Sequence, residues 1–108
     1  IDCFQKFLSP ESRMVCATFI SSDGNYEMAI RLAEDIFRKF PTNITFKYQL
    51  AEIYFEKIRD TKNKELILKA KPLYESIYLE IQNPKYLREK GMKDSSQDRI
   101  RTLDNMLD

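Results

Sequence analysis

The chain has 108 residues, of which 43% are hydrophobic and 32% are charged, so it is long enough for one core and too apolar for a disordered segment. Its net charge of +1 removes the strongest argument for a nucleic-acid partner. No apolar run approaches the roughly 20 residues of a membrane span, and two glycines with four prolines disfavour a turn-rich all-β fold. We therefore expect an all-α domain with no membrane partner.

The first two predicted helices lie before residue 22. Residues 2–8 have apolar side chains at helical spacing and predict a short helix. Ser9 can cap a second helix, Pro10 suits its first position, and the apolar run that follows carries it to about Ser21. Because this run is apolar on more than one side, we expect more than one neighbour to cover it.

Two amphipathic helices follow and form the clearest part of the pattern. Gly24 and Asn25 mark the break before a helix predicted over residues 26–40, with Asn25 as its cap. Residues 41–43, Pro-Thr-Asn, end that helix and offer a Thr or Asn cap for the next. That next helix is predicted over residues 44–58 from its apolar stripe.

The signals in the next part of the chain are weaker. Residues 59–65 are polar and predict a loop, and apolar positions over residues 66–81 predict a further helix. Pro72 lies inside this helical pattern, where a proline costs about 3 kcal/mol. We therefore expect either a kink near Leu68 or a helix that restarts close to Ala70.

The last part of the chain predicts a capping helix. Residues 85–90 predict at most a turn of helix that ends at Gly91. Residues 94–96, Asp-Ser-Ser, can cap a final helix over residues 94–107, which has apolar side chains along one side.

The chain is similar to itself at an offset of 34 residues. The helices that begin near residues 10 and 44 then align, with similar side chains at core-facing positions: Met14 with Tyr48, Cys16 with Leu50, Ala17 with Ala51, and Ile20 with Tyr54. The second helices also align if residues 59–65 are treated as an insertion. A helix-turn-helix unit of this length predicts two repeat units, at about residues 10–43 and 44–84.

These features resemble the tetratricopeptide repeat family, in which paired antiparallel helices cross at small residues and a proline closes each unit. Small side chains let helix axes approach to the close end of the usual spacing of about 8–10 Å. Arg13 and Lys47 depart from the family pattern, because they stand where an aromatic residue is usual. A plain helical bundle whose apolar stripes coincide remains the alternative. The matching residues are Ala17, Ile20, Ala29, Ala33 and Pro41 in the first unit, and Leu50, Ala51, Tyr54, Ala70, Tyr74 and Pro84 in the second.

The resemblance implies that the first helix of each unit lines an inner groove. The partner-binding residues would then be Met14, Thr18, Tyr48, Glu52 and Phe55. Such a groove is apolar with an acidic edge at Glu52, which suits a partner helix or peptide that carries a basic residue. The same side chains could instead pack against a neighbouring helix or a further copy of the domain.

The chemistry available points away from catalysis. The chain has no histidine, only two cysteines and only two glycines, so we expect no metal, no cofactor and no phosphate-binding loop, and we do not expect an enzyme. The leading hypothesis is a protein–protein interaction scaffold or adaptor, and the alternative is homo-oligomerisation. A nucleic-acid-binding role for the basic residues between Lys57 and Lys71 is a third hypothesis, although a solvated loop and helix face, interrupted by acidic residues, is the favoured interpretation.

The cysteines and the N-terminus bear on location. Cys16 lies in an apolar helical run, which favours a reduced buried thiol over a disulfide with Cys3. No signal peptide is visible, so we expect an intracellular protein, cytoplasmic or nuclear. The chain begins at Ile1 without an initiator Met, and we expect it to be part of a longer protein.

Overall fold

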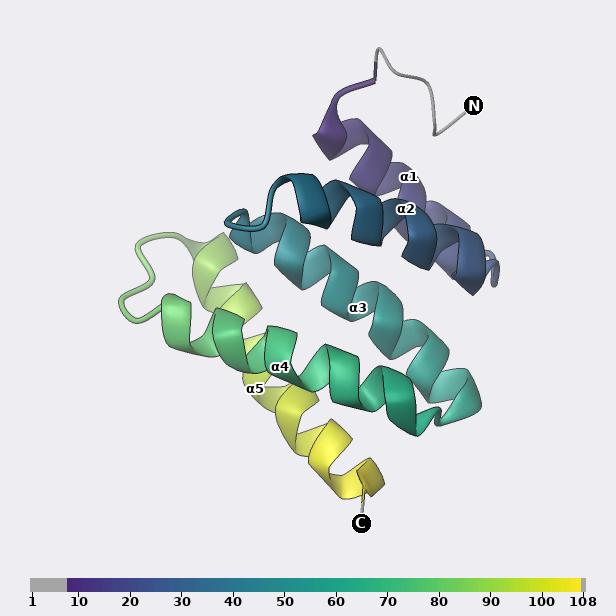
Figure 1. Ribbon diagram of the computed structural model, residues 1–108. Helices are drawn as coiled ribbons and strands as arrows, with labels where there is room; N and C mark the ends of the chain where they lie inside the picture. Colours follow the sequence, from purple (N-terminus) through teal and green to yellow (C-terminus); the bar gives the residue numbers. More distant parts are fainter. Residues whose placement is uncertain (1–7, 108) are drawn as a thin grey trace.

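The computed structural model describes residues 8–107, so the predicted helix at residues 2–8 lies almost wholly outside the described part. Within that part no strand is present, and the all-α prediction is confirmed. The chain forms five helices, labelled in Figure 1: α1 (Pro10–Ser22), α2 (Tyr26–Lys39), α3 (Ile44–Thr61), α4 (Lys64–Glu80) and α5 (Leu87–Leu107).

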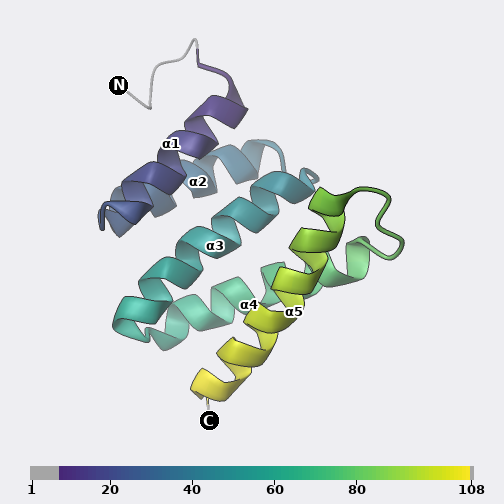
Figure 2. The ribbon, with the colours of Figure 1, turned by 180° about the vertical axis from the view of Figure 1, so that it is seen from behind.

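The helices form two layers. Seen from behind in Figure 2, α1, α3 and α5 lie side by side, and α2 and α4 lie on the opposite side, which faces the reader in Figure 1. Each helix packs on its neighbours along the chain, and α1 also packs on α3. The result is a slab of 39 × 35 × 20 Å, and its packing is compatible with an all-α helical repeat fold.

Local signals at the helix starts explain most boundaries. The Ser9 hydroxyl oxygen accepts a hydrogen bond from the Ser12 amide at 3.1 Å, and the Asn43 side chain accepts one from the Phe46 amide at 2.9 Å. Gly24 ends α1 with a φ of +92°, a conformation that glycine adopts without strain. Asn25 precedes α2, but its side chain makes no capping bond, so the cap predicted there is absent.

Of the two alternatives predicted for Pro72, a restart of the helix close to Ala70 was wrong, whereas a kink near Leu68 within the continuous helix stays a prediction. Helix α4 begins at Lys64, where the Asn63 side chain accepts from two backbone amides, and it continues through Pro72. Pro72 is exposed, so water can satisfy the carbonyl that loses its helical partner. Most of the predicted loop at residues 59–65 is helical too, because α3 continues to Thr61 and α4 begins at Lys64. The short connection between them turns at Lys62, which adopts the left-handed conformation with a φ of 53°.

The prediction for α5 was also wrong in two respects. The helix begins at Leu87 rather than at residue 94, and it runs through Gly91 without a break. Residues 94–96 therefore lie inside the helix and cap nothing. The reason is tertiary packing: Met92 is buried with Ile77 and Ile81, and this burial offsets the roughly 1 kcal/mol that glycine costs within a helix.

The main hydrophobic cluster of the described residues extends from α1 to α5 and includes fully buried Tyr74 and Leu103, while Ile77, Ile81 and Met92 form a smaller one. The repeat alanines lie in it with no exposed surface, as expected of residues that let helices approach closely. These alanines are Ala17, Ala29, Ala33, Ala51 and Ala70.

Candidate interaction surface

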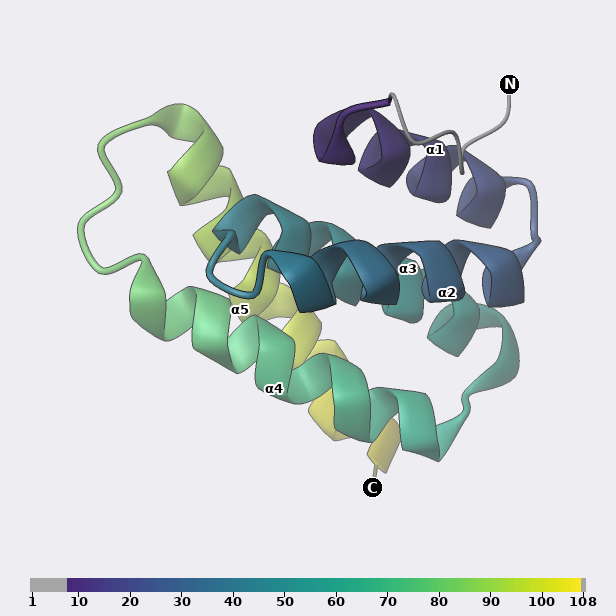
Figure 3. The ribbon, with the colours of Figure 1, turned by 45° about the horizontal axis from the view of Figure 1, so that its top comes forward.

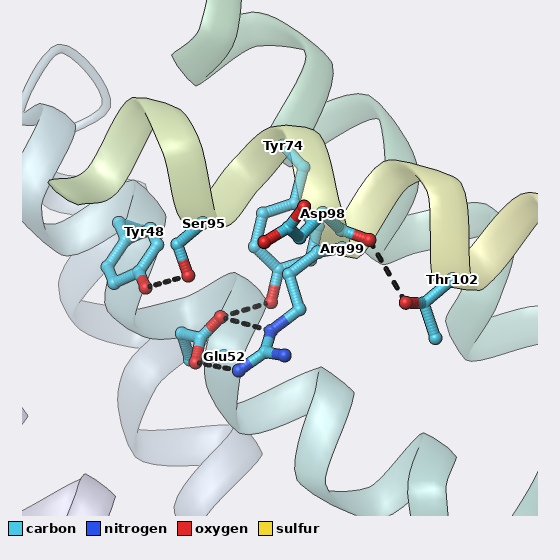
Figure 4. A network of polar contacts seen from close by, with 7 residues as sticks. All are labelled: Tyr48, Glu52, Tyr74, Ser95, Asp98, Arg99 and Thr102. Atoms are coloured by element: carbon cyan, nitrogen blue, oxygen red, sulfur yellow. Dashed lines mark hydrogen bonds and ion pairs between the residues drawn. The ribbon is translucent and has the colours of Figure 1, made fainter. Parts of the chain in front are cut away.

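A polar network centred on Glu52 of α3 joins three helices (Figure 4). The Tyr74 hydroxyl of α4 donates to the Glu52 carboxylate at 2.7 Å. Arg99 of α5 donates to both carboxylate oxygens, from Nε at 3.0 Å and from one terminal nitrogen at 3.2 Å. This two-pronged geometry is the strong form of a carboxylate–guanidinium pair, and it ties α5 to α3.

Aromatic side chains surround this network. The Arg99 guanidinium lies 4.1 Å from the centre of the Phe55 ring, and Phe55 is only 4% exposed. Tyr48 donates its hydroxyl hydrogen to the Ser95 hydroxyl of α5 at 2.9 Å and meets the Tyr74 ring edge-to-face at 6.4 Å. The contacts with α5 therefore cover much of the inner side of α3.

The network shifts three ionisation equilibria. Burial raises the pKa of Tyr74, and the nearby Glu52 carboxylate raises it further. Burial also raises the pKa of Tyr48, while the hydrogen bond from Arg99 to Glu52 raises the pKa of Arg99. Around neutral pH the tyrosines are thus neutral donors and Arg99 is a cation, which is the state in which these hydrogen bonds form.

The five predicted groove residues do not form one open groove. Met14 is fully buried in the core, and Phe55 lies beneath Arg99. Glu52 is neutralised by Arg99, so the predicted acidic edge is absent. Thr18 is half-buried and its hydroxyl donates to the Val15 carbonyl at 2.7 Å. Tyr48 lines a cleft.

That cleft lies between the first turns of α3 and α5 and has a volume of about 460 Å³. Tyr48 and Met92 contribute apolar surface to the cleft, and the exposed Arg88 contributes a positive charge. Gly91 also lines the cleft and has no side chain to occupy it. Thr45, Gln49 and Ser95 add groups that can donate or accept hydrogen bonds. The charge at this cleft is thus basic rather than acidic.

The residues that pattern reading missed are Ser95 and Arg99. They lie four positions apart in α5 and meet Tyr48 and Glu52, which lie four positions apart in α3. This matched spacing is present in the sequence. It becomes a signal only once α3 and α5 are known to be neighbours.

Lys47, one of the two departures from the repeat pattern, is a buried cation. Its side chain is 9% exposed, and its ammonium group contacts the Ser76 hydroxyl at 2.8 Å and the Glu80 carboxylate at 2.9 Å. Lys47 therefore joins α3 to α4 by an ion pair. At the equivalent site in α1, the Nε of Arg13 is buried with no hydrogen-bond partner within residues 8–107.

The remaining candidate features are less organised. Cys16 is only half-buried rather than buried, and Cys3 lies outside the described residues. The basic residues between Lys57 and Lys71 are divided among α3, the loop and α4, and Lys71 pairs with Asp104 at 2.6 Å. Across residues 8–107, no group of three acidic, cysteine or histidine side chains could hold a metal ion. None of the helices described in this range has the length and apolar character needed to cross a membrane.

Comparison with known proteins adds no assignment. No protein-family model, curated protein or solved structure matches the chain.

Proposed function

We propose that this chain is a non-catalytic protein-interaction module of tetratricopeptide-like helices, which acts inside the cell as a scaffold or adaptor. Its task is to hold a short segment of a partner protein against the layer formed by α1, α3 and α5. The observation that carries the proposal is the cleft between α3 and α5. It combines an aromatic wall at Tyr48, an apolar floor at Met92 and a single strong cation at Arg88.

This combination suits one kind of ligand. A peptide or helix with one apolar side chain would place that side chain against Tyr48 and Met92, and an acidic side chain would pair with Arg88. Thr45 and Gln49 can bind polar groups of the same segment. The preference for an acidic partner reverses the expectation from the sequence, because Arg99 neutralises Glu52 while Arg88 remains exposed.

The network around Glu52 supports a binding role rather than catalysis. Its carboxylate oxygens already accept from Tyr74 and Arg99, and burial keeps Tyr74 protonated. These groups hold α3, α4 and α5 at fixed positions, which forms the cleft before any ligand binds.

The test uses peptides selected on the intact protein from a random 12-residue display library, with affinity measured by fluorescence anisotropy. Two variants alter the cleft without removing a core contact. Arg88→Glu reverses its charge, and Gly91→Gln adds a side chain to its lining at a position where a Cβ atom would meet no other atom within 4 Å. The matched control is Arg101→Glu, since Arg101 is also an exposed cation of α5 but does not line the cleft.

We expect the selected peptides to be acidic and apolar, and each cleft variant to weaken them about tenfold or more, as for the loss of an interface charge or apolar contact. Arg101→Glu should leave affinity unchanged. Peptides that bind all four proteins equally would refute the cleft as the binding site. Phe55→Ala would be a poor test, because Phe55 is buried and its loss would disturb the fold.

A further inference from the structure

Helix α1 lies at one end of the molecule and exposes an apolar face. Figure 3 shows α2 and α3 between α1 and α4, so nothing in residues 8–107 covers the outer side of α1. Phe19 is 68% exposed and Val15 is 44% exposed. They line a pocket of about 410 Å³ together with Leu8, Glu11, Ser12 and Cys16. Glu11 is the one charged side chain of this lining.

The repeat relationship shows what usually covers such a face. At the offset of 34 residues, Ser12, Cys16, Phe19 and Ile20 of α1 correspond to Phe46, Leu50, Ile53 and Tyr54 of α3. All four α3 residues are at most 4% exposed.

Helix α2 covers that face of α3. Phe40 at the end of α2 packs edge-to-face on Phe46 with ring centres 5.9 Å apart, and Glu34 accepts a hydrogen bond from Tyr54. The covering element in this molecule is therefore an amphipathic helix. Within residues 8–107, α1 packs on α2 and α3, and no further helix covers the equivalent side chains.

The opposite end of the molecule is different. Helix α5 presents exposed polar side chains, among them Gln97, Asp98, Arg101 and Asn105, to solvent. A polar outer face is what a terminal helix needs to remain soluble without a further neighbour. Along most of its length α5 thus has a polar outer face, whereas α1 exposes Val15 and Phe19.

We infer that the outer face of α1 docks an amphipathic helix of a partner protein, which packs on it as α2 packs on α3 and carries a basic side chain opposite Glu11. A second copy fits less well, because pairing α1 with α1 would bring another acidic Glu11 rather than a cation to the pocket. This docking surface is separate from the cleft between α3 and α5, and it does not depend on the function proposed for that cleft.

The test uses a peptide of residues 26–39, the α2 sequence, labelled with fluorescein and held helical by a staple between the exposed positions 27 and 31. It retains two basic residues, Arg38 and Lys39, near its end. Anisotropy is measured with the intact protein and with Phe19→Ser and Glu11→Lys. The matched control is Leu79→Ser, because Leu79 is 65% exposed on α4 and does not line the pocket.

We expect saturable binding that Phe19→Ser weakens about tenfold or more, since docking would bury this largely exposed ring. Glu11→Lys should weaken it less, with a loss that shrinks as salt is added. Leu79→Ser, Arg88→Glu and Gly91→Gln should bind as the unaltered protein does.

Three results would overturn the inference. The first is no saturable binding, and the second is equal loss in Phe19→Ser and Leu79→Ser. The third is a dimer in sedimentation that Phe19→Ser abolishes, which would assign the pocket to a second copy. Arg88→Glu and Gly91→Gln alter only the cleft between α3 and α5, whereas Phe19→Ser and Glu11→Lys alter only the pocket on α1. A negative result at one of these two surfaces therefore does not affect the result at the other.

Discussion

The contribution of Glu52 to stability can be divided between its hydrogen bond from Tyr74 and its ion pair with Arg99. Glu52→Ala leaves the Tyr74 hydroxyl, which belongs to a residue with no exposed surface, without an acceptor, at a cost of about 1–3 kcal/mol. It also removes the ion pair with Arg99. Because the two side chains are 27% and 31% exposed, that loss adds only about 1 kcal/mol. We therefore expect Glu52→Ala to lower the free energy of unfolding by about 2–4 kcal/mol.

A conservative variant isolates the buried part. Glu52→Gln keeps an acceptor oxygen for Tyr74 and loses only the ion pair, so it should cost about 1 kcal/mol. In a Tyr74→Phe background the buried donor is absent, and Glu52→Ala should then cost about 1–3 kcal/mol less than in the unaltered protein. Glu75→Ala, on the exposed side of α4, is the control and should change stability by less than about 0.5 kcal/mol.

Urea unfolding followed by circular dichroism measures Glu52→Ala, Glu52→Gln, Tyr74→Phe, the Tyr74→Phe/Glu52→Ala double variant and Glu75→Ala, and an unchanged slope with urea shows that the comparison is sound. The reasoning fails if Glu52→Ala and Glu52→Gln are equally destabilising, since the buried Tyr74 hydroxyl would then contribute nothing. It also fails if Tyr74→Phe does not reduce the cost of Glu52→Ala.

Two further predictions concern glycine and pH. Gly91→Ala should stabilise the protein by about 0.5–1 kcal/mol, because Gly91 lies inside α5 with open space for a methyl group. Gly24→Ala should destabilise it by about 1 kcal/mol, because the φ of +92° strains any residue with a Cβ atom. Urea midpoints of both variants check this, and a loss of stability in Gly91→Ala would contradict a regular helix at that position. The pKa values of Tyr74 and Tyr54 are raised, so at high pH the native state retains protons that the unfolded state loses. The contribution of these two tyrosines to the free energy of unfolding is therefore complete below about pH 10. Above that pH it falls by up to about 1.4 kcal/mol per pH unit for each tyrosine. Urea midpoints between about pH 8 and pH 11 should decline, less steeply in Tyr74→Phe, and an identical decline in that variant would exclude Tyr74 as a contributor.

Much of the fold could be predicted because its signals act over a few residues. The Ser9–Pro10 start of α1, the glycine turn at Gly24 and the Asn43 cap each operate within one turn of helix. The apolar periodicity of the first three helices and the repeated alanines also depend on local spacing.

The candidate sites could be predicted only in part. Tyr48 was found because the repeat resemblance identifies the inner side of α3, and it does line the cleft. Ser95, which binds Tyr48, and Arg99, which binds Glu52, each lie 47 residues away along the chain from the residue they contact. No local pattern relates residues at that separation. The burial of Lys47 escaped prediction for the same reason, since Glu80 lies 33 residues away.

By itself the sequence determined an all-α chain, its first three helices with the caps of α1 and α3, and the alanines that are buried in the core. Only the tertiary structure decided that α5 starts at Leu87, that it closes over Glu52 and Phe55, and that α1 rather than α3 keeps an open apolar face. The physical reason is the range of the forces involved. Hydrogen bonds within a helix and its caps join residues that are neighbours in the chain. Burial of a side chain depends instead on tertiary packing against residues that are distant in the sequence.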